Sequence, residues 1–184
     1  MKNEFGKIMQ VGYIVEDVEA AAAQWSSRLD IGPFYMIDNA MDQYYYRGVR
    51  TDVELRMAFA YWGGVQVELI QPLSTTDTLY SRALKDSPGQ LNHYATLVTD
   101  LDGLLERHNL HDKVIQSGKM PTGLKFVYLE NHLPGGLHLE LIEAQESTLQ
   151  AFAAMQMIAE NWDGKNPLRS MLTVGDDIAA MKRA

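Results

Sequence analysis

The stretch Ile8-Met9-Gln10-Val11-Gly12-Tyr13-Ile14-Val15-Glu16-Asp17-Val18 has a counterpart later in the chain, Leu91-Asn92-His93-Tyr94-Ala95-Thr96-Leu97-Val98-Thr99-Asp100-Leu101. Each copy is a β-like run that ends in an apolar residue, a variable residue, an aspartate and a second apolar residue. Each copy is followed by another β-like run that ends in Glu-Leu-Ile, at residues 68–70 and 140–142. This internal repetition predicts two similar structural units built on one plan.

The first unit is predicted to have the element order β-α-β-β-β. Residues 8–15 alternate as a strand, with Gln10, Gly12 and Ile14 on one face. Asp17 is placed to cap a helix whose inner side would carry residues 20–23, Trp25 and Leu29. After the Gly32-Pro33 stop and the Gly63-Gly64 hairpin signal, the remaining strands are expected at 34–37, 44–47, 53–62 and 65–71. The spacing from Gln10 to Glu68 exceeds that from His93 to Glu140, which indicates an insertion around residues 44–46.

The second unit repeats this order after a linker at 72–89, for which a short helix at 78–85 is expected. Asp100 is placed to cap its helix, and Pro134-Gly135-Gly136 forms its turn. Its elements are predicted as a strand at 91–98, a helix at 101–109, and strands at 113–116, 124–129 and 137–143.

The pattern changes after residue 146. The sequence Ser147-Thr148-Leu149-Gln150 resembles a capping box, and Phe152, Met155, Ala159 and Trp162 follow at helical spacing. We therefore predict a helix at 147–162 whose apolar face covers the core, a pocket mouth or a second subunit. From Asp163 the signals are weak, and a partly flexible tail is expected.

Composition excludes several classes of protein. The chain has 184 residues and a net charge of −8, with no long basic cluster, which argues against binding to nucleic acid or anionic membranes. No apolar run is long enough to span a bilayer, no secretory signal core is visible, and there is no cysteine. We expect a cytoplasmic protein without disulfides.

The repeats place polar residues at matching positions, with Gln10 against His93 and Glu68 against Glu140. One amide oxygen, two carboxylates and one imidazole suit a divalent ion such as Zn, Mn, Co, Ni or Mg. Singly, each residue has an ordinary explanation, such as a solvated carboxylate or a structural histidine. Together, at matching positions of a repeat, they predict one metal site.

The order of these features resembles the vicinal oxygen chelate superfamily, which includes glyoxalase I, methylmalonyl-CoA epimerase, extradiol dioxygenases and bleomycin-resistance proteins. The resemblance rests on the paired strand–Asp–helix openings, on the segment from Trp25 through Gly32-Pro33-Phe34, and on the two Glu-Leu-Ile endings. It implies an α+β fold in which two tandem βαβββ modules, 7–72 and 90–144, form a cup-shaped mixed sheet. The domain would span residues 1–146, with a C-terminal helical extension at 147–184.

The resemblance also implies the metal ligands Gln10, Glu68, His93 and Glu140, although many members have a histidine where this chain has Gln10. The implied function is that of a metal-dependent isomerase, epimerase or lyase, in which proton transfer occurs next to a metal-bound carbonyl. Glu140 and Glu68 would be the catalytic residues, with Glu140 the preferred base. His138, two residues before Glu140, would be a proton-transfer group or a plain structural histidine.

Two other functions stay open. A ring-cleaving dioxygenase favours two histidines and one carboxylate around iron, whereas the matching positions here supply one histidine. A metal-free small-molecule binding protein of the resistance type would have to bury both carboxylates without a counterion. In all cases we expect a small-molecule partner, with a carbonyl group in the enzymatic reading, and a homodimer.

Overall fold

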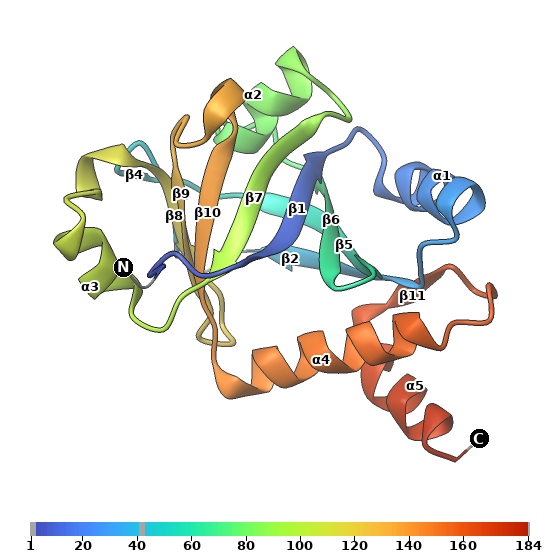
Figure 1. Ribbon diagram of the computed structural model, residues 1–184. Helices are drawn as coiled ribbons and strands as arrows, with labels where there is room; N and C mark the ends of the chain where they lie inside the picture. Colours follow the sequence, from blue (N-terminus) through green and yellow to red (C-terminus); the bar gives the residue numbers. More distant parts are fainter. Residues whose placement is uncertain (1–2, 41–42, 184) are drawn as a thin grey trace.

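The computed structural model describes residues 3–40 and 43–183. Within these residues the chain forms one curved mixed sheet in the order β11-β2-β5-β6-β1-β7-β10-β9-β8-β3-β4, with helices packed around it (Figure 1). The α+β class with two modules and a C-terminal extension is therefore confirmed. Among the residues that the structure describes, no helix is both long enough and apolar enough to cross a membrane.

The first module contributes four adjacent strands, in the order β2-β5-β6-β1. Its helix begins as predicted, because the Asp17 side chain accepts a hydrogen bond from the Ala20 N–H at 2.9 Å. The inner side of the helix is carried by Val18, Ala22 and Ser26, whereas Leu29 is exposed, so the predicted inward position of Leu29 was wrong. The elements are β1 (Ile8–Ile14), α1 (Val18–Leu29), β2 (Phe34–Ala40), β5 (Glu54–Trp62) and β6 (Val65–Pro72).

The second module repeats the plan, in the strand order β7-β10-β9-β8. Asp100 caps its helix by accepting from the Gly103 N–H at 3.0 Å. The helix between the modules is also present, with Thr78 and Ser81 in a reciprocal cap. These elements are α2 (Leu79–Asp86), β7 (Leu91–Leu97), α3 (Leu101–Arg107), η1 (His111–Lys113), β8 (Val114–Lys119), β9 (Lys125–Leu129), η2 (Pro134–Gly136) and β10 (His138–Glu143).

The two modules meet at the antiparallel pair β1–β7, and each places its first strand parallel to its last. In the first module Gly12 pairs with Glu68, and in the second Ala95 pairs with Glu140. The sequence repeat is thus an equivalence of register, and it brings the two Glu-Leu-Ile strands to either side of the central pair.

The predicted strand at 44–47 does not belong to the first module's half of the sheet. The hairpin of β3 (Gln43–Tyr46) and β4 (Val49–Arg50) pairs with β8 of the second module, with Tyr45 opposite Ser117. Tyr44 and Tyr46 are buried against the core there, which gives the crossing its driving force. The insertion in the first repeat therefore extends the far edge of the cup.

The C-terminal extension is more ordered than predicted. It comprises α4 (Glu146–Glu160), β11 (Leu168–Ser170), η3 (Met171–Thr173) and α5 (Val174–Met181). The helix α4 starts one residue before Ser147 and ends before Trp162, and its N-cap Gln145 makes no side-chain hydrogen bond, so the predicted capping box was wrong. The expected flexible tail is also wrong, because β11 pairs in parallel with β2. Trp162 lies beyond the helix and covers Gly32.

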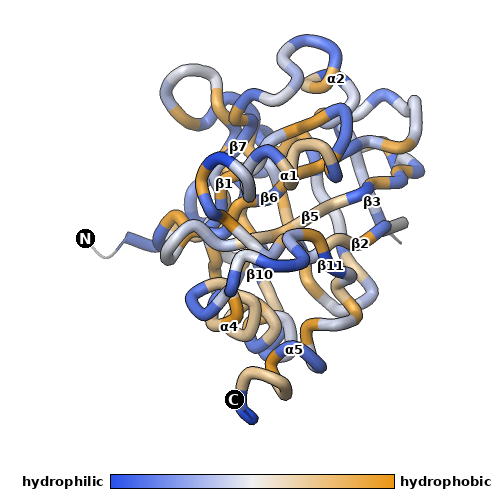
Figure 2. Tube along the Cα trace, turned by 90° about the vertical axis from the view of Figure 1, so that its right-hand side faces the viewer, coloured by the Kyte–Doolittle hydropathy of each residue, from blue (hydrophilic) through white to orange (hydrophobic). Residues whose placement is uncertain are grey.

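The extension packs against the first module through an apolar cluster that includes Tyr35, Tyr61, Met155 and Val174. The Tyr35 hydroxyl donates to the Asp177 carboxylate of α5 at 2.7 Å. Figure 2 shows α4 and α5 side by side, with apolar residues along both. The extension thus closes one side of the sheet with an apolar layer.

Candidate metal centre

Three of the four predicted ligands converge beneath the concave face of the sheet. The Nε2 atom of His93 lies 3.2 Å from Oε2 of Glu68 and 3.4 Å from Oε2 of Glu140. All three donor atoms lie within 4.8 Å of one another. The imidazole is fully buried, and the two carboxylates are almost so. The two distances from His93 are close to those between ligand atoms in a zinc shell, which lie roughly 3.3–3.6 Å apart when each bond is about 2.0–2.2 Å.

The donor atoms of these residues have no hydrogen-bond partner within the described chain. They are Oε2 of Glu68, Nε2 of His93 and Oε2 of Glu140, and all three are inaccessible to solvent. Buried polar atoms without partners cost about 1–3 kcal/mol each, and more when they are charged. A divalent cation at their centre would remove this cost, so the donor set fits a metal.

The orientation of the His93 ring supports the same assignment. Its Nδ1 atom lies 3.1 Å from the side-chain oxygen of Asn92, a contact that a ring N–H satisfies. With the proton on Nδ1, the lone pair of Nε2 faces two carboxylates. Metal-ligating histidines typically donate their second nitrogen in this way. Asn92 was not among the residues predicted from the sequence.

Gln10, the fourth predicted ligand, lines the same cavity as the two glutamates. Its amide nitrogen donates to Oε1 of Gln66 at 2.7 Å, and Gln66 in turn donates to the Tyr61 hydroxyl at 3.2 Å. This chain of bonds fixes the amide so that its NH2 points away from the site. The remaining Oε1 of Gln10 is buried without a partner, and it is the atom with which an amide would bind a metal.

Electrostatics single out Glu140. Burial raises the pKa of the Glu140 carboxyl well above its ordinary value of 4.5, and the nearby Glu68 carboxylate raises it further. The Tyr128 hydroxyl acts in the opposite direction. In the absence of a cation, this carboxyl therefore holds a proton more readily than an exposed glutamate does.

His138 takes no part in the cluster. Its Nδ1 accepts a hydrogen bond from the Asn131 N–H at 3.3 Å, and the residue does not line the cavity. Burial, followed by the proximity of His93, lowers the pKa of the His138 imidazole. The described contacts of His138 are those of a structural histidine at the strand end.

Gly12 is a further component of the site. It pairs with His93 across the β1–β7 boundary, and a Cβ at this position would overlap the imidazole, with Nδ1 only 2.5 Å away. The missing side chain at Gly12 therefore provides the space for the His93 ring. The strand alternation predicts Gly12 on the same face as Gln10, and a glycine on an inward face next to a candidate ligand is the sequence signal for this role.

The cluster opens into an apolar cavity of about 340 Å3. The cavity lies between the sheet and α4, and its aromatic and sulfur-containing walls include Phe59, Tyr128, Phe152 and Met155. Tyr80 and Tyr128 are buried beside the carboxylates, with their hydroxyls 3.3 Å apart. A small molecule in this cavity would meet the donor cluster at one end and hydrocarbon elsewhere.

Comparison with known proteins supports this picture at the level of fold and family. The family model for the Glyoxalase/Bleomycin resistance protein/Dioxygenase superfamily matches residues 9–128. No curated protein sequence matches the chain. Methylmalonyl-CoA epimerase from Mycobacterium tuberculosis is similar in structure, with a TM-score of 0.57 at 16% identity, over 82% of this chain and 96% of the epimerase.

Two other solved structures are similar. The hypothetical protein BH1468 from Bacillus halodurans C-125 has a TM-score of 0.54 at 15% identity, over 76% of this chain and 95% of its own. A methylmalonyl-CoA epimerase in complex with methylmalonyl-CoA and NH4+ has a TM-score of 0.53 at 15% identity, over 77% of this chain and 96% of its own. At these identities the structures show a shared fold, whereas the family match covers most of the chain. The chain belongs to the glyoxalase, bleomycin resistance protein and dioxygenase superfamily.

Proposed function

We propose that this protein is a metal-dependent isomerase, epimerase or lyase that moves a proton on a carbon next to a carbonyl group. Gln10, Glu68, His93 and Glu140 would hold one divalent ion. That ion would supply Lewis-acid chemistry, by polarising the carbonyl and stabilising negative charge on its oxygen. The observation that carries the proposal is the buried, unpartnered donor set of Glu68, His93 and Glu140.

The two carboxylates provide the proton chemistry. They approach the imidazole from β6 and β10, strands on opposite sides of the central β1–β7 pair. A small molecule between them could lose a proton to one carboxylate and receive a proton from the other. Both carboxylates line the cavity, and we take Glu140 as the preferred base. Glu68 is the alternative.

The surroundings would protect this chemistry from water. Tyr80 and Tyr128 are fully buried beside the two carboxylates, and the Tyr128 ring packs edge-on against His93 with ring centres 5.0 Å apart. The two tyrosine rings would hold the imidazole of His93 in place and keep water from the carboxylates. Epimerisation in the structurally similar epimerases is the kind of reaction that this arrangement suits, and their likeness adds support at the level of fold.

Metal content is the first test. Protein purified without chelators, and reconstituted separately with Zn, Mn, Co, Ni and Mg, should bind about one equivalent by elemental analysis and calorimetry. His93→Ala should abolish metal binding, whereas substitution of the exposed His111 by Ala should leave metal binding unchanged. Failure of every metal to bind would overturn the metal-dependent function and favour the metal-free binding protein.

Proton transfer is the second test. Benzoin is a neutral hydroxyketone with a carbon-bound proton next to its carbonyl, and it should exchange that proton with solvent deuterium, as followed by proton NMR. Glu140→Gln keeps the shape and an oxygen ligand but removes the base, so exchange should fall by on the order of 10²–10⁴-fold. The matched control is Glu54→Gln on the exposed side of β5. Full exchange in both Glu140→Gln and Glu68→Gln, with metal still bound, would refute the assignment of either carboxylate as base. Oxygen consumption with catechols would favour the dioxygenase.

A further inference from the structure

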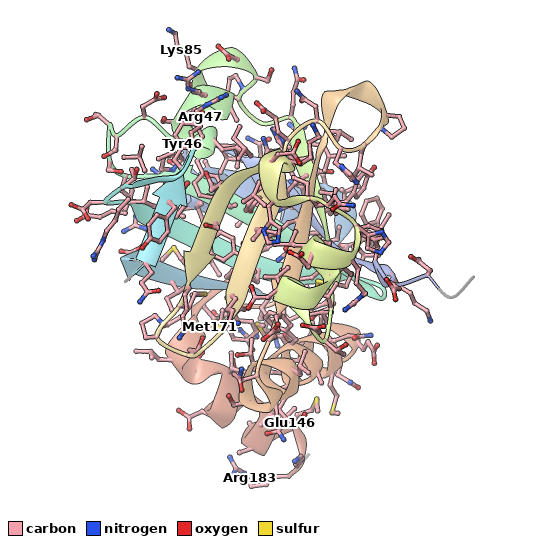
Figure 3. The ribbon with its side chains drawn as sticks, turned by 90° about the vertical axis from the view of Figure 1, so that its left-hand side faces the viewer. Tyr46, Arg47, Lys85, Glu146, Met171 and Arg183 are labelled. Carbon is pink, nitrogen blue, oxygen red and sulfur yellow. The ribbon has the colours of Figure 1, made fainter. Side chains whose placement is uncertain are left out.

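The C-terminal extension builds one wall of the cavity that leads to the donor cluster. Thr148, Ala151, Phe152 and Met155 of α4 line it, together with Met171 of the following segment. Figure 3 shows Met171 where the C-terminal segment meets the strands. The family match ends at residue 128, so this wall lies outside the part of the chain that the family model describes.

The opposite wall comes from both modules and is equally apolar. Ile37, Met57 and Phe59 contribute from β2 and β5, and Leu124 and Phe126 from the second module. Four methionines in all line the cavity, Met57, Met120, Met155 and Met171. Methionine side chains adapt to irregular apolar ligands through their flexible thioethers. Apart from the donor end and the hydroxyl groups of Thr122, Ser147 and Thr148, the lining therefore offers contacts for hydrocarbon.

The charge of the lining is one-sided. Among the described residues that line the cavity, no lysine or arginine is present, and the only carboxylic acids are Glu68 and Glu140. A ligand with a free carboxylate, phosphate or sulfonate on its body would place that anion where the described lining offers no basic side chain and two acidic groups lie nearby. Such burial costs several kcal/mol. Binding sites for acidic ligands usually carry an arginine or lysine.

The size of the cavity sets a second limit. About 340 Å3 is at the lower end of the range for ligand sites, about 300–1,000 Å3. It can enclose a compact two-ring or branched molecule, but not a nucleotide-linked thioester as a whole.

We propose that the cavity selects an uncharged, apolar small molecule, and that α4 supplies one wall of the binding site. The ligand would place its oxygen atoms at the donor cluster and its hydrocarbon body against Phe152, Met155 and Met171. The inference names the substrate class of the proposed function, and therefore rests on it for the chemistry. The binding of an apolar body, however, needs no metal, so the two can be tested separately.

The test uses a matched pair of fluorescent probes. N-phenyl-1-naphthylamine is uncharged, and 8-anilino-1-naphthalenesulfonate has the same N-phenylnaphthylamine skeleton with an added sulfonate. Titration of the chelator-treated full-length protein should show saturable binding of the neutral probe. The anionic probe should bind at least about tenfold more weakly, because 1.4 kcal/mol of unpaired-charge cost already gives that factor.

Two variants of α4 locate the binding. Ala151 lines the cavity, whereas Ala153, two residues later, is exposed. Ala151→Trp should fill the cavity and weaken the affinity for the neutral probe at least tenfold. Ala153→Trp should leave that affinity unchanged. Ala151→Leu, a smaller change that keeps the helix, should weaken it by an intermediate factor, and thermal unfolding of each variant checks that it folds.

The outcomes separate the two proposals. Binding of the neutral probe that Ala151→Trp abolishes supports the cavity assignment, even when the protein binds no metal. Equal affinity for both probes, or binding that Ala151→Leu and Ala151→Trp leave unchanged, would overturn it. Failure of metal binding or of proton exchange with an intact probe site would overturn the proposed function alone.

Discussion

Replacing Gly12 by alanine should damage the site without touching any ligand. The added Cβ would overlap the imidazole of His93, which is fully buried. Forcing extra carbon into a packed interior costs typically about 1–3 kcal/mol. Gly12 does not have a positive φ, so alanine also brings the usual gain of about 0.4–1 kcal/mol from a stiffer unfolded chain. Overpacking outweighs this gain, and we expect a net loss of roughly 1–2 kcal/mol.

The loss should be visible in two assays. Urea or thermal unfolding in the presence of a chelator should show the destabilisation, as a fall in melting temperature of about 2–4 °C per kcal/mol for a chain of this size. Calorimetry should show metal affinity reduced by about 10–100-fold, the usual cost of misorienting a histidine ligand.

Gly64→Ala is the matched control, because nothing lies within 4 Å of a Cβ there and its φ is not positive. If Gly12→Ala were as stable as Gly64→Ala and bound metal with the original affinity, the role assigned to the glycine would be refuted.

Three further predictions follow from the same geometry. In chelator-treated protein the raised pKa of Glu140 favours folding while the carboxyl is neutral, so this contribution to stability is complete below about pH 4.5 and is lost as the pH rises through the higher folded-state pKa. The free energy of unfolding of the original chain should therefore fall relative to that of Glu140→Gln as the pH increases. A difference between the two that stays constant with pH would contradict this prediction. Asn92→Ala should weaken metal binding by about 10–100-fold in calorimetry while Glu68 and His93 stay in place, because the ring loses the acceptor for Nδ1. Tyr35→Phe should lower the free energy of unfolding by about 1–2 kcal/mol in urea titrations, because the Tyr35 hydroxyl donates a hydrogen bond to a carboxylate on α5. The control is Tyr45→Phe on the exposed face of β3, which should leave the free energy of unfolding unchanged.

The sequence predicted most of the two modules because their signals are local and repeated. Alternation marks the strands, Asp17 and Asp100 cap helices within three residues, and the matched Glu-Leu-Ile endings fix which strands are equivalent. The four ligand positions followed from the same repetition. The structure places Glu68, His93 and Glu140 together because the first and last strands of each module pair in parallel and at the same register. Equivalent positions of the sequence repeat therefore lie at equivalent places in the sheet.

Long-range packing explains what the sequence did not predict. Residues 168–170 are too few to show a strand period, and β11 forms because β2 offers an unpaired edge. The β3 hairpin joins the second module because burial of Tyr44 and Tyr46 against the core stabilises it there. Local alternation predicts a strand but cannot indicate with which module that strand pairs. The start of α4 at Glu146 shows the same limit, since packing of Met155 and Ile158 against the sheet positions the helix without a side-chain cap.

The same register also accounts for the one place where the two ligand sets differ. Across the central β1–β7 pair, Gly12 faces His93 and Ala95 faces Gln10. A planar imidazole ring lies over its cross-strand neighbour and needs a glycine there, whereas the flexible amide of Gln10 extends toward Gln66 and tolerates the methyl group of Ala95. In this chain a glutamine at position 10 is therefore paired with an alanine, whereas the histidine at position 93 is paired with a glycine. On this reasoning Gln10→His alone should fit poorly beside Ala95, and Gln10→His combined with Ala95→Gly should restore the symmetry of the site. Calorimetry with Zn on the single and double variants would check this, and equal affinities in the two would show that the cross-strand residue does not constrain the ligand.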